Sequence, residues 1–230
     1  MEYIPGGYTL NLPGGCFPLS TDSVVLAQFV KLPKNARILD LGSGCGTLGA
    51  LLCGKDSACH VTGIELDPHA HEAALDNICR NGLSHRMESI CADLRTVPEV
   101  LPDIVFDCIL SNPPYFSGGP ASKQLPNARR EDTCTAGELF RAASRMLKYG
   151  GDFFLVHRPE RLAELIRLAG ENQMEAKRLL LLRHREGGPI NLILLQLRKG
   201  GKPGLIFEEA SLFDKNDHPT AFYRSVYHLD

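Results

Sequence analysis

A polar amide, two prolines and an aromatic ring directly follow an apolar run in the stretch from Asp107 to Tyr115. Proline cannot continue a central strand, and the residue before a proline is pushed to extended geometry, so a strand is expected to end at Asn112. Asn112, the Pro113 carbonyl and Tyr115 would then lie at the carboxyl edge of a sheet, where open α/β folds bind ligands. The alternative is a plain strand-end turn with a buried tyrosine.

Acidic residues end three successive predicted strands, at Asp40, Glu65 and Asp93. Because the carboxyl ends of parallel strands meet at one edge, we expect these carboxylates to share a cleft. Asp40 would repel a pyrophosphate but attract an ammonium group. Glu65 is placed to accept both hydrogen bonds of a ribose diol. Asp93 either accepts from an adenine amino group or caps the next turn.

A glycine-rich loop, Gly42-Ser43-Gly44-Cys45-Gly46, follows the strand that ends near Asp40. Its glycines leave the main chain bare where strand turns into helix, so a ligand can approach the backbone N–H groups. A generic tight turn is the alternative. The spacing is G-x-G-x-G, whereas the dinucleotide fingerprint is G-x-G-x-x-G, which disfavours a dehydrogenase that uses NAD.

These features together resemble the class I S-adenosylmethionine-dependent methyltransferases, and Asn-Pro-Pro-Tyr at 112–115 resembles the motif of their amino-methyltransferase branch. That branch methylates a planar, conjugated nitrogen, such as N6 of adenine or a side-chain amide. The resemblance implies S-adenosylmethionine as the cofactor and no metal. It implies that the catalytic residues are Asn112, Pro113, Pro114 and Tyr115. The cofactor-binding residues it implies are Thr21, Asp22, Asp40, Gly42, Ser43, Gly44, Gly46, Glu65, Leu66, Asp93, Leu94 and Asn112.

The chemistry of such a site follows from the acceptor. An exocyclic adenine nitrogen delocalises its lone pair into the ring and is therefore a poor nucleophile. Hydrogen bonds from its two N–H groups to the Asn112 side-chain oxygen and the Pro113 carbonyl would localise that pair and aim it at the methyl group. Tyr115 would stack on the flipped base.

Two further stretches narrow the resemblance, from Phe17 to Ala27 and from Arg129 to Thr133. With them the chain resembles the bacterial tRNA1(Val) adenine-N6 methyltransferases, which modify adenine 37 beside the anticodon. The resemblance implies a tRNA partner and substrate contacts by Tyr115, Arg129 and Arg130. Two explanations exist for Thr21 and Asp22. Family members place the corresponding threonine and aspartate against the cofactor, and capping of the following helix is the alternative.

A second basic region extends from Ala176 to Lys202, with seven Lys/Arg and one acidic residue. These cations either contact RNA or form the solvated face of an edge strand. The loop 116–131 is rich in helix and strand breakers and reads as a functional lid or as disorder.

Alternating strands and helices predict an α/β fold, and the resemblance makes it Rossmann-like, with a mostly parallel sheet and helices on both faces. The sheet is expected to have seven strands, the last two of which, 176–183 and 190–197, form an antiparallel pair at its edge. We expect one methyltransferase domain over 1–230. It comprises an N-terminal hairpin or lid and helix (1–35), a catalytic core (36–200) and a docked C-terminal tail (201–230).

The composition fits one well-buried domain, since the 230 residues are 43% apolar and 23% charged. A net charge of −2 argues against coating nucleic acid by bulk charge. The eight cysteines include no C-x-x-C pair, which indicates reduced core thiols rather than zinc or disulfides. We see no signal peptide and no membrane segment, and expect a soluble cytoplasmic monomer or weak homodimer.

Other functions remain open at this point. The same Asn-Pro-Pro-Tyr chemistry serves methylation of a protein glutamine amide, although those enzymes usually carry a helical domain before the glycine loop. Amino methylation of DNA or ribosomal RNA is a further alternative. A non-catalytic scaffold subunit that retains cofactor binding belongs to a different class, which intact Asn112, Pro113, Tyr115 and Glu65 disfavour.

Overall fold

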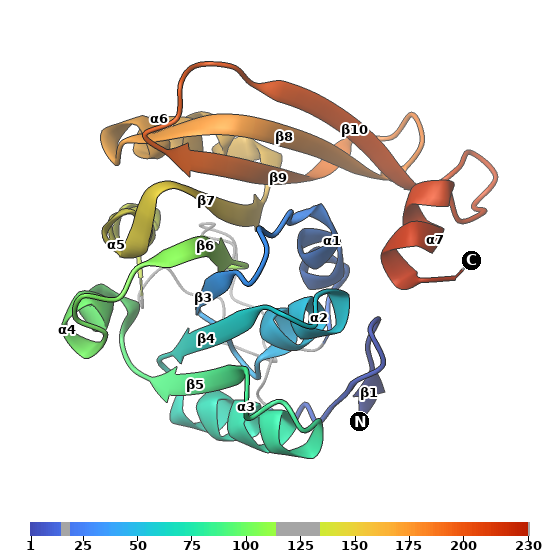
Figure 1. The fold of residues 1–230 in the computed structure, drawn as a ribbon. Coiled ribbons are helices and arrows are strands. Elements are labelled where there is room, and N and C mark those ends of the chain that lie inside the picture. Colours follow the sequence, from blue (N-terminus) through green and yellow to red (C-terminus); the bar gives the residue numbers. More distant parts are fainter. Residues whose placement is uncertain (15–18, 114–133, 230) are drawn as a thin grey trace.

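An eight-stranded sheet forms the centre of the computed structural model (Figure 1). The structure describes residues 1–14, 19–113 and 134–229. The strands are β3 (Arg37–Leu41), β4 (His60–Glu65), β5 (Met87–Cys91), β6 (Phe106–Ser111), β7 (Leu147–His157), β8 (Met174–Arg185), β9 (Ile190–Lys199) and β10 (Ile206–Phe213). Their order across the sheet is β10-β8-β9-β7-β6-β3-β4-β5. A separate antiparallel ribbon joins β1 (Glu2–Tyr3) to β2 (Thr9–Leu10).

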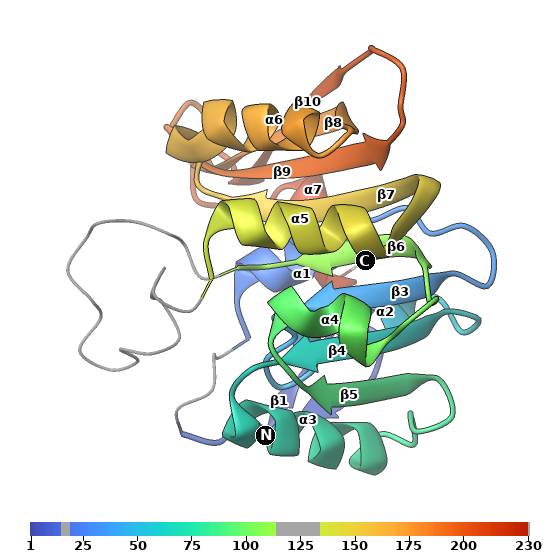
Figure 2. The same ribbon diagram turned by 90° about the vertical axis from the view of Figure 1, so that its left-hand side faces the viewer.

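Helices cover both faces of this sheet, as Figures 1 and 2 show. One face carries α1 (Thr21–Phe29), α2 (Thr47–Lys55), α3 (Pro68–Arg80) and α7 (Ala221–Tyr227). The other carries α4 (Val97–Val100), α5 (Ala136–Met146) and α6 (Leu162–Glu171). Short 3-10 turns, η1 (Leu94–Thr96) and η2 (Pro159–Arg161), precede α4 and α6. The apolar side chains therefore form two layers, one on each side of the strands.

The order of the strands reverses direction at β3. The chain passes from β3 to β4 and β5 on one side, and then returns to β6 and β7 on the other. β3 pairs in parallel with both β4 and β6, and Asp40 lies opposite Gly63 and Leu110. Such a reversal leaves a crevice outside the carboxyl ends of the strands, where open α/β sheets bind ligands.

The expected fold class is confirmed: the sheet is mostly parallel, and β9 is antiparallel to both β7 and β8. The predicted antiparallel pair at 176–183 and 190–197 is present as β8 and β9. Fully buried residues such as Ile38 and Leu39 on β3 show why the central strands read as continuous apolar runs.

The predicted number of strands is wrong, because residues 206–213 form an eighth strand that pairs in parallel with β8. The β8–β9 pair is therefore one strand in from the edge. This segment lies within 201–230, which the sequence predicts to be a docked tail. Its signal is weak because Ile206 and Phe207 are exposed, at 60% and 66%, and Leu212 is the one buried residue of the strand. Backbone pairing and the ion pair between Arg178 and Glu208 hold the strand in place.

All cysteines that the structure describes are free thiols, four of them buried: Cys45, Cys53, Cys59 and Cys108. Cys79 and Cys91 are exposed, so the expectation of core thiols holds for only part of the set. Cys16 lies outside the described residues. Among the described helices, none is both long and apolar enough to cross a bilayer.

Candidate active site

The glycine loop turns the chain from β3 into α2 at the carboxyl edge of the sheet. Gly42, Gly44 and Gly46 all have positive φ angles, of 76°, 55° and 82°, which side-chain-bearing residues rarely adopt. The N–H groups of Gly42 and Ser43 both donate to the Ile64 carbonyl, at 2.9 and 3.0 Å. A Cβ on Gly42 or Gly44 would meet no atom of the described residues within 4 Å. The main chain at these two glycines is therefore open to the approach of a ligand on the described part of the chain.

Glu65 ties this loop to the end of β4. Its Oε2 accepts from the Gly44 N–H at 2.7 Å, and its Oε1 accepts from the Asp67 N–H at 2.8 Å. Asp67 in turn caps α3, since its side chain accepts from the His69 N–H. The glycine loop and Glu65 are thus in direct contact, as expected for residues of one cofactor site. Leu66, the next residue, is 47% exposed.

Asp40 is buried beneath the loop, only 1% exposed, and neither of its carboxylate oxygens has a hydrogen-bond partner among the described residues. Ser43 Oγ is likewise buried without a partner there. Burial, and next the charge of Glu65, raise the pKa of Asp40 to about 7. A buried carboxylate without a donor is costly, so a ligand that brings donors, such as an ammonium group, fits this position.

Gly63 makes room for the Ser43 side chain. A Cβ at this position would lie 2.7 Å from Ser43 Oγ and 2.9 Å from Ser43 Cβ. The glycine on β4 therefore allows the loop after β3 to pack closely against the neighbouring strand.

Asp93 follows β5 and combines a cap with an ion pair. Its side chain accepts from the Arg95 N–H at 2.9 Å, which begins η1 at Leu94. Arg95 Nε also lies 2.9 Å from both Asp93 oxygens, and this hydrogen bonding lowers the pKa of Asp93. The structure thus shows the capping interaction that was one of the two explanations of Asp93. Contact of Asp93 or Leu94 with an adenine ring stays a prediction.

Asn112 lies at the end of β6, two residues beyond the strand partner of Asp40. Its side-chain Nδ2 donates to Ser23 Oγ at 3.0 Å. The preceding Ser111 is buried and donates from Oγ to the Leu41 carbonyl at 2.8 Å, which ties the ends of β6 and β3 together. Pro113 is buried, and Pro114, Tyr115, Arg129 and Arg130 lie outside the described residues.

Thr21 and Asp22 form the first turn of α1, and Ser20 rather than either of them is its N-cap. Ser20 Oγ accepts from the Ser23 N–H at 3.3 Å. The Tyr227 hydroxyl, on α7, donates to Thr21 Oγ1 at 3.1 Å. The C-terminal helix therefore reaches the same helix end that contacts Asn112. No sequence pattern links Tyr227 to Thr21 or singles out Ser23 as a partner of Asn112.

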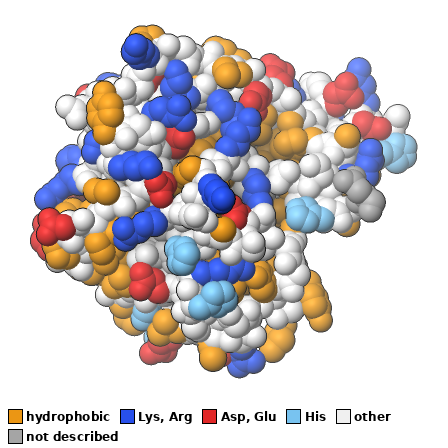
Figure 3. All heavy atoms as spheres, in the orientation of Figure 1, with side chains coloured by type: hydrophobic (Ala, Val, Ile, Leu, Met, Phe, Trp, Pro, Cys, Tyr) orange, Lys and Arg blue, Asp and Glu red, His pale blue; other side chains and the backbone are white. Residues whose placement is uncertain are grey.

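The basic region from 176 to 202 is balanced by four acidic residues that lie outside it. The ion pairs are Arg178–Glu208, Arg183–Glu209, Arg185–Asp217 and Arg198–Asp152. Lys177 and Lys199 donate to backbone carbonyls. Figure 3 shows acidic side chains interspersed with Lys and Arg on one face. The structure therefore gives these cations roles within the fold, while their contact with RNA remains untested.

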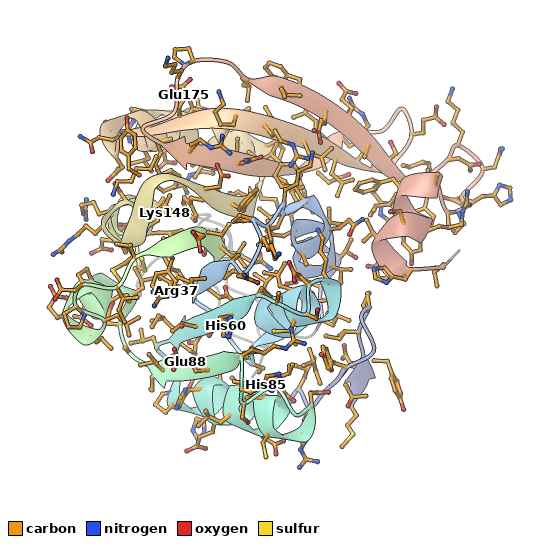
Figure 4. All side chains as sticks on the ribbon, in the orientation of Figure 1. Arg37, His60, His85, Glu88, Lys148 and Glu175 are labelled. Carbon is orange, nitrogen blue, oxygen red and sulfur yellow. The ribbon has the colours of Figure 1, made fainter. Side chains whose placement is uncertain are left out.

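The residues labelled in Figure 4 mark the opposite edge of the sheet. Arg37 and His60 begin β3 and β4, and Lys148 and Glu175 lie one residue into β7 and β8. The glycine loop, Glu65 and Asn112 instead lie at the carboxyl ends of these parallel strands. In Figure 2 the arrowheads of β3 and β4 point to that edge.

Known proteins resemble this chain in both sequence and structure. Residues 19–170 match the model of the family described as the methyltransferase small domain. A Bacteroides fragilis protein named tRNA1(Val) (adenine(37)-N6)-methyltransferase is 29% identical over 91% of this chain and 90% of the relative. A Dickeya chrysanthemi protein of the same name is 32% identical over 80% of this chain and 74% of the relative.

Two solved structures illustrate the likeness of the fold. A protein from Agrobacterium tumefaciens, titled a predicted O-methyltransferase, superposes with a TM-score of 0.76 at 25% identity, over 90% of this chain and 96% of that one. The 16S rRNA N2 G1207 methyltransferase of T. thermophilus, in complex with AdoMet and guanosine, gives a TM-score of 0.63 at 24% identity. That match covers 86% of this chain and 49% of the ribosomal RNA enzyme.

Proposed function

The chain belongs to the methyltransferase small domain family, and we propose that it methylates the exocyclic N6 of adenine in tRNA, at adenine 37 of tRNA1(Val). It is an S-adenosylmethionine-dependent methyltransferase, as the resemblance implied. The substrate rests on the names of its relatives and on the chemistry of residues 112–115. A tRNA substrate would fit an activity in the cytoplasm.

The residues at the carboxyl edge fit the parts of S-adenosylmethionine. The donor supplies a methyl group on a positively charged sulfur. Asp40 would hold the ammonium of its amino-acid end, since this buried carboxylate has no donor of its own among the described residues. The open side of the loop at Gly42 and Gly44 accommodates a close approach to the main chain. Glu65 would accept from the ribose hydroxyls with the lone pairs that Gly44 and Asp67 leave unused.

Asn112 and Pro113 would act on the acceptor. The Asn112 side-chain oxygen and the Pro113 carbonyl accept from the two N–H groups of the amino nitrogen, which localises its lone pair and orients it. Both residues follow β6 directly, next to the strand that carries Asp40. A hydroxyl group has one O–H donor, whereas an amino group has two N–H donors. Two acceptors side by side therefore favour an amino group over a hydroxyl.

One observation carries the proposal: Asn112 donates its Nδ2 to Ser23 and so leaves Oδ1 for a donor from outside the described chain. Tyr115 would stack on the base, and Arg129 and Arg130 would contact phosphate. These three residues keep the roles that the resemblance implies.

The test is methyl transfer to defined RNA. An unmodified tRNA1(Val) transcript is incubated with the protein and S-adenosylmethionine carrying a labelled methyl group, beside the same transcript with adenine 37 replaced by guanine. We expect one methyl group per transcript in the first and none in the second, with N6-methyladenosine found by mass spectrometry of the digest. Equal labelling of both transcripts, or labelling of neither, would overturn the substrate assignment.

A further inference from the structure

Ser23 connects the first turn of α1 to the end of β6. It is 7% exposed, and its Oγ accepts from Asn112 Nδ2 at 3.0 Å although the two residues lie 89 positions apart. Among the described residues, this is the hydrogen bond made by the Asn112 side chain, and it uses Nδ2 and not Oδ1. The helix therefore contacts the amide group itself as well as the strand that carries it.

The orientation of this amide decides what it can do. An asparagine side chain presents an acceptor on one side and two donors on the other, and a half-turn exchanges them. An amino group that approaches Asn112 brings donors, so only Oδ1 can receive them. The flipped amide would turn the N–H groups of Asn112 toward the N–H groups of the incoming amino group. Neither set of donors would then have an acceptor.

A serine hydroxyl can donate or accept, so the role of Ser23 depends on its contact with Ser20, in which either hydroxyl can be the donor. Ser20 Oγ lies 3.4 Å from Ser23 Oγ and is held in place as the N-cap of α1. When the Ser23 hydroxyl hydrogen points to Ser20, the lone pairs of Ser23 face Asn112. The flipped amide would then place Oδ1 against those lone pairs, which is repulsive.

We propose that Ser23 is a positioning residue for methyl transfer, which sets the amide of Asn112 with Oδ1 toward the acceptor nitrogen. The inference rests on the proposed function for the identity of the acceptor, but the orientation of the amide can be measured without any substrate. Ser23 touches neither the donor nor the acceptor in this account and acts through Asn112 alone.

The first test uses kinetics with Ser23→Ala, Ser23→Thr and, as a matched control, Ser144→Ala. Ser144 is a half-buried serine on α5 that donates to the Asn172 carbonyl at 2.8 Å. Ser144→Ala therefore removes a hydrogen-bonded hydroxyl, as Ser23→Ala does, but away from Asn112. We expect kcat of Ser23→Ala to fall about five- to tenfold, the worth of one hydrogen bond, with KM for tRNA and donor affinity within about twofold. Ser23→Thr keeps the hydroxyl and should recover most of kcat, and Ser144→Ala should match the parent.

The second test needs no RNA and no activity. The side-chain amide signals of Asn112 in a ¹⁵N spectrum are assigned by their loss in Asn112→Asp. We expect the proton that donates to Ser23 to shift and to exchange faster in Ser23→Ala, and to stay unchanged in Ser144→Ala. Unchanged amide signals in Ser23→Ala, or equal losses of kcat and donor affinity, would overturn the positioning role. If the parent fails to methylate tRNA, the proposed function fails, while the amide spectrum still decides the role of Ser23.

Discussion

The backbone N–H of Gly44 donates to Oε2 of Glu65 across 2.7 Å, so the loop after β3 and the end of β4 form one unit. The second oxygen of Glu65 accepts from the Asp67 N–H at 2.8 Å. Two backbone donors thus fix the orientation of the carboxylate before any ligand binds. Each of its oxygens keeps a second lone pair that can accept from a ligand. Preorganisation of this kind lowers the entropy cost of binding.

Removal of this carboxylate should weaken donor binding strongly. Glu65→Ala loses both the proposed ribose contacts and the tie to Gly44, and hydrogen bonds to a charged group are worth about 1.5–3 kcal/mol. We expect the dissociation constant for S-adenosylmethionine to rise about 10- to 100-fold by titration calorimetry. Glu88→Gln changes an exposed residue of β5 that accepts from Thr62, and this control should bind as the parent does. Parent-like affinity in Glu65→Ala would contradict the assignment.

Donor affinity should depend on pH through Asp40, whose pKa is raised to about 7 by burial and by Glu65. The ionised carboxylate is the form that attracts an ammonium group. Affinity should therefore rise from pH 6 to pH 7 and level off above, with about one proton released per donor bound at pH 6. Calorimetry in two buffers of different ionisation enthalpy counts the protons. In Asp40→Asn the proton release should vanish, and a flat pH profile in the parent would contradict this role.

Asp40 should also shape the stability of the ligand-free protein. Its folded-state pKa of about 7 lies above the ordinary aspartate value of 3.8, so the native state binds more protons between these two pH values. Stability from this group is therefore fully present below about pH 4 and is lost as pH rises through 7. Relative to the parent, Asp40→Asn should gain up to about 1.4 kcal/mol per pH unit across this window, and nothing more above it. Parallel denaturant-midpoint curves for the two proteins would refute the burial of a protonated Asp40.

Arg130 is expected to act on RNA alone. Arg130→Ala should weaken tRNA binding and reduce the salt dependence of affinity by about one phosphate contact, because a phosphate contact releases about one counterion. Affinity for S-adenosylmethionine should stay the same. Arg167→Ala removes an exposed arginine on α6 that pairs with Glu171, and serves as the control in a filter-binding series over salt concentration. An Arg130→Ala variant with parent-like tRNA affinity at every salt concentration would rule out the contact.

The sequence alone predicted the central features of the fold because they depend on local signals. Asp40, Glu65 and Asn112 follow apolar runs that end in glycine, an acid or proline, and each of them lies where its strand ends or within one residue of that end. Parallel pairing then brings these ends to one edge. The antiparallel pair β8–β9 was predicted from the short connection between its strands.

Long-range contacts were missed because no local pattern encodes them. β10 exposes Ile206 and Phe207 and buries only Leu212, so its own side chains mark it weakly as a strand, and its backbone pairing with β8 is a long-range contact. The hydrogen bonds from Asn112 to Ser23 and from Tyr227 to Thr21 join residues 89 and 206 positions apart. The sequence shows the excess of positive charge in 176–202, but the acidic partners of its arginines lie outside the region, at Glu208, Glu209, Asp217 and Asp152.

The most direct measurement is the single-turnover rate of methyl transfer to tRNA by Asn112→Ala, with donor affinity measured on the same preparation. If the amide positions the acceptor nitrogen, the rate should fall at least about a hundredfold, since misplacement of reactants costs that much, while donor affinity stays within about threefold of the parent. A variant that transfers methyl groups at the parent rate would contradict the account, because the end of β6 would then play no part in the reaction.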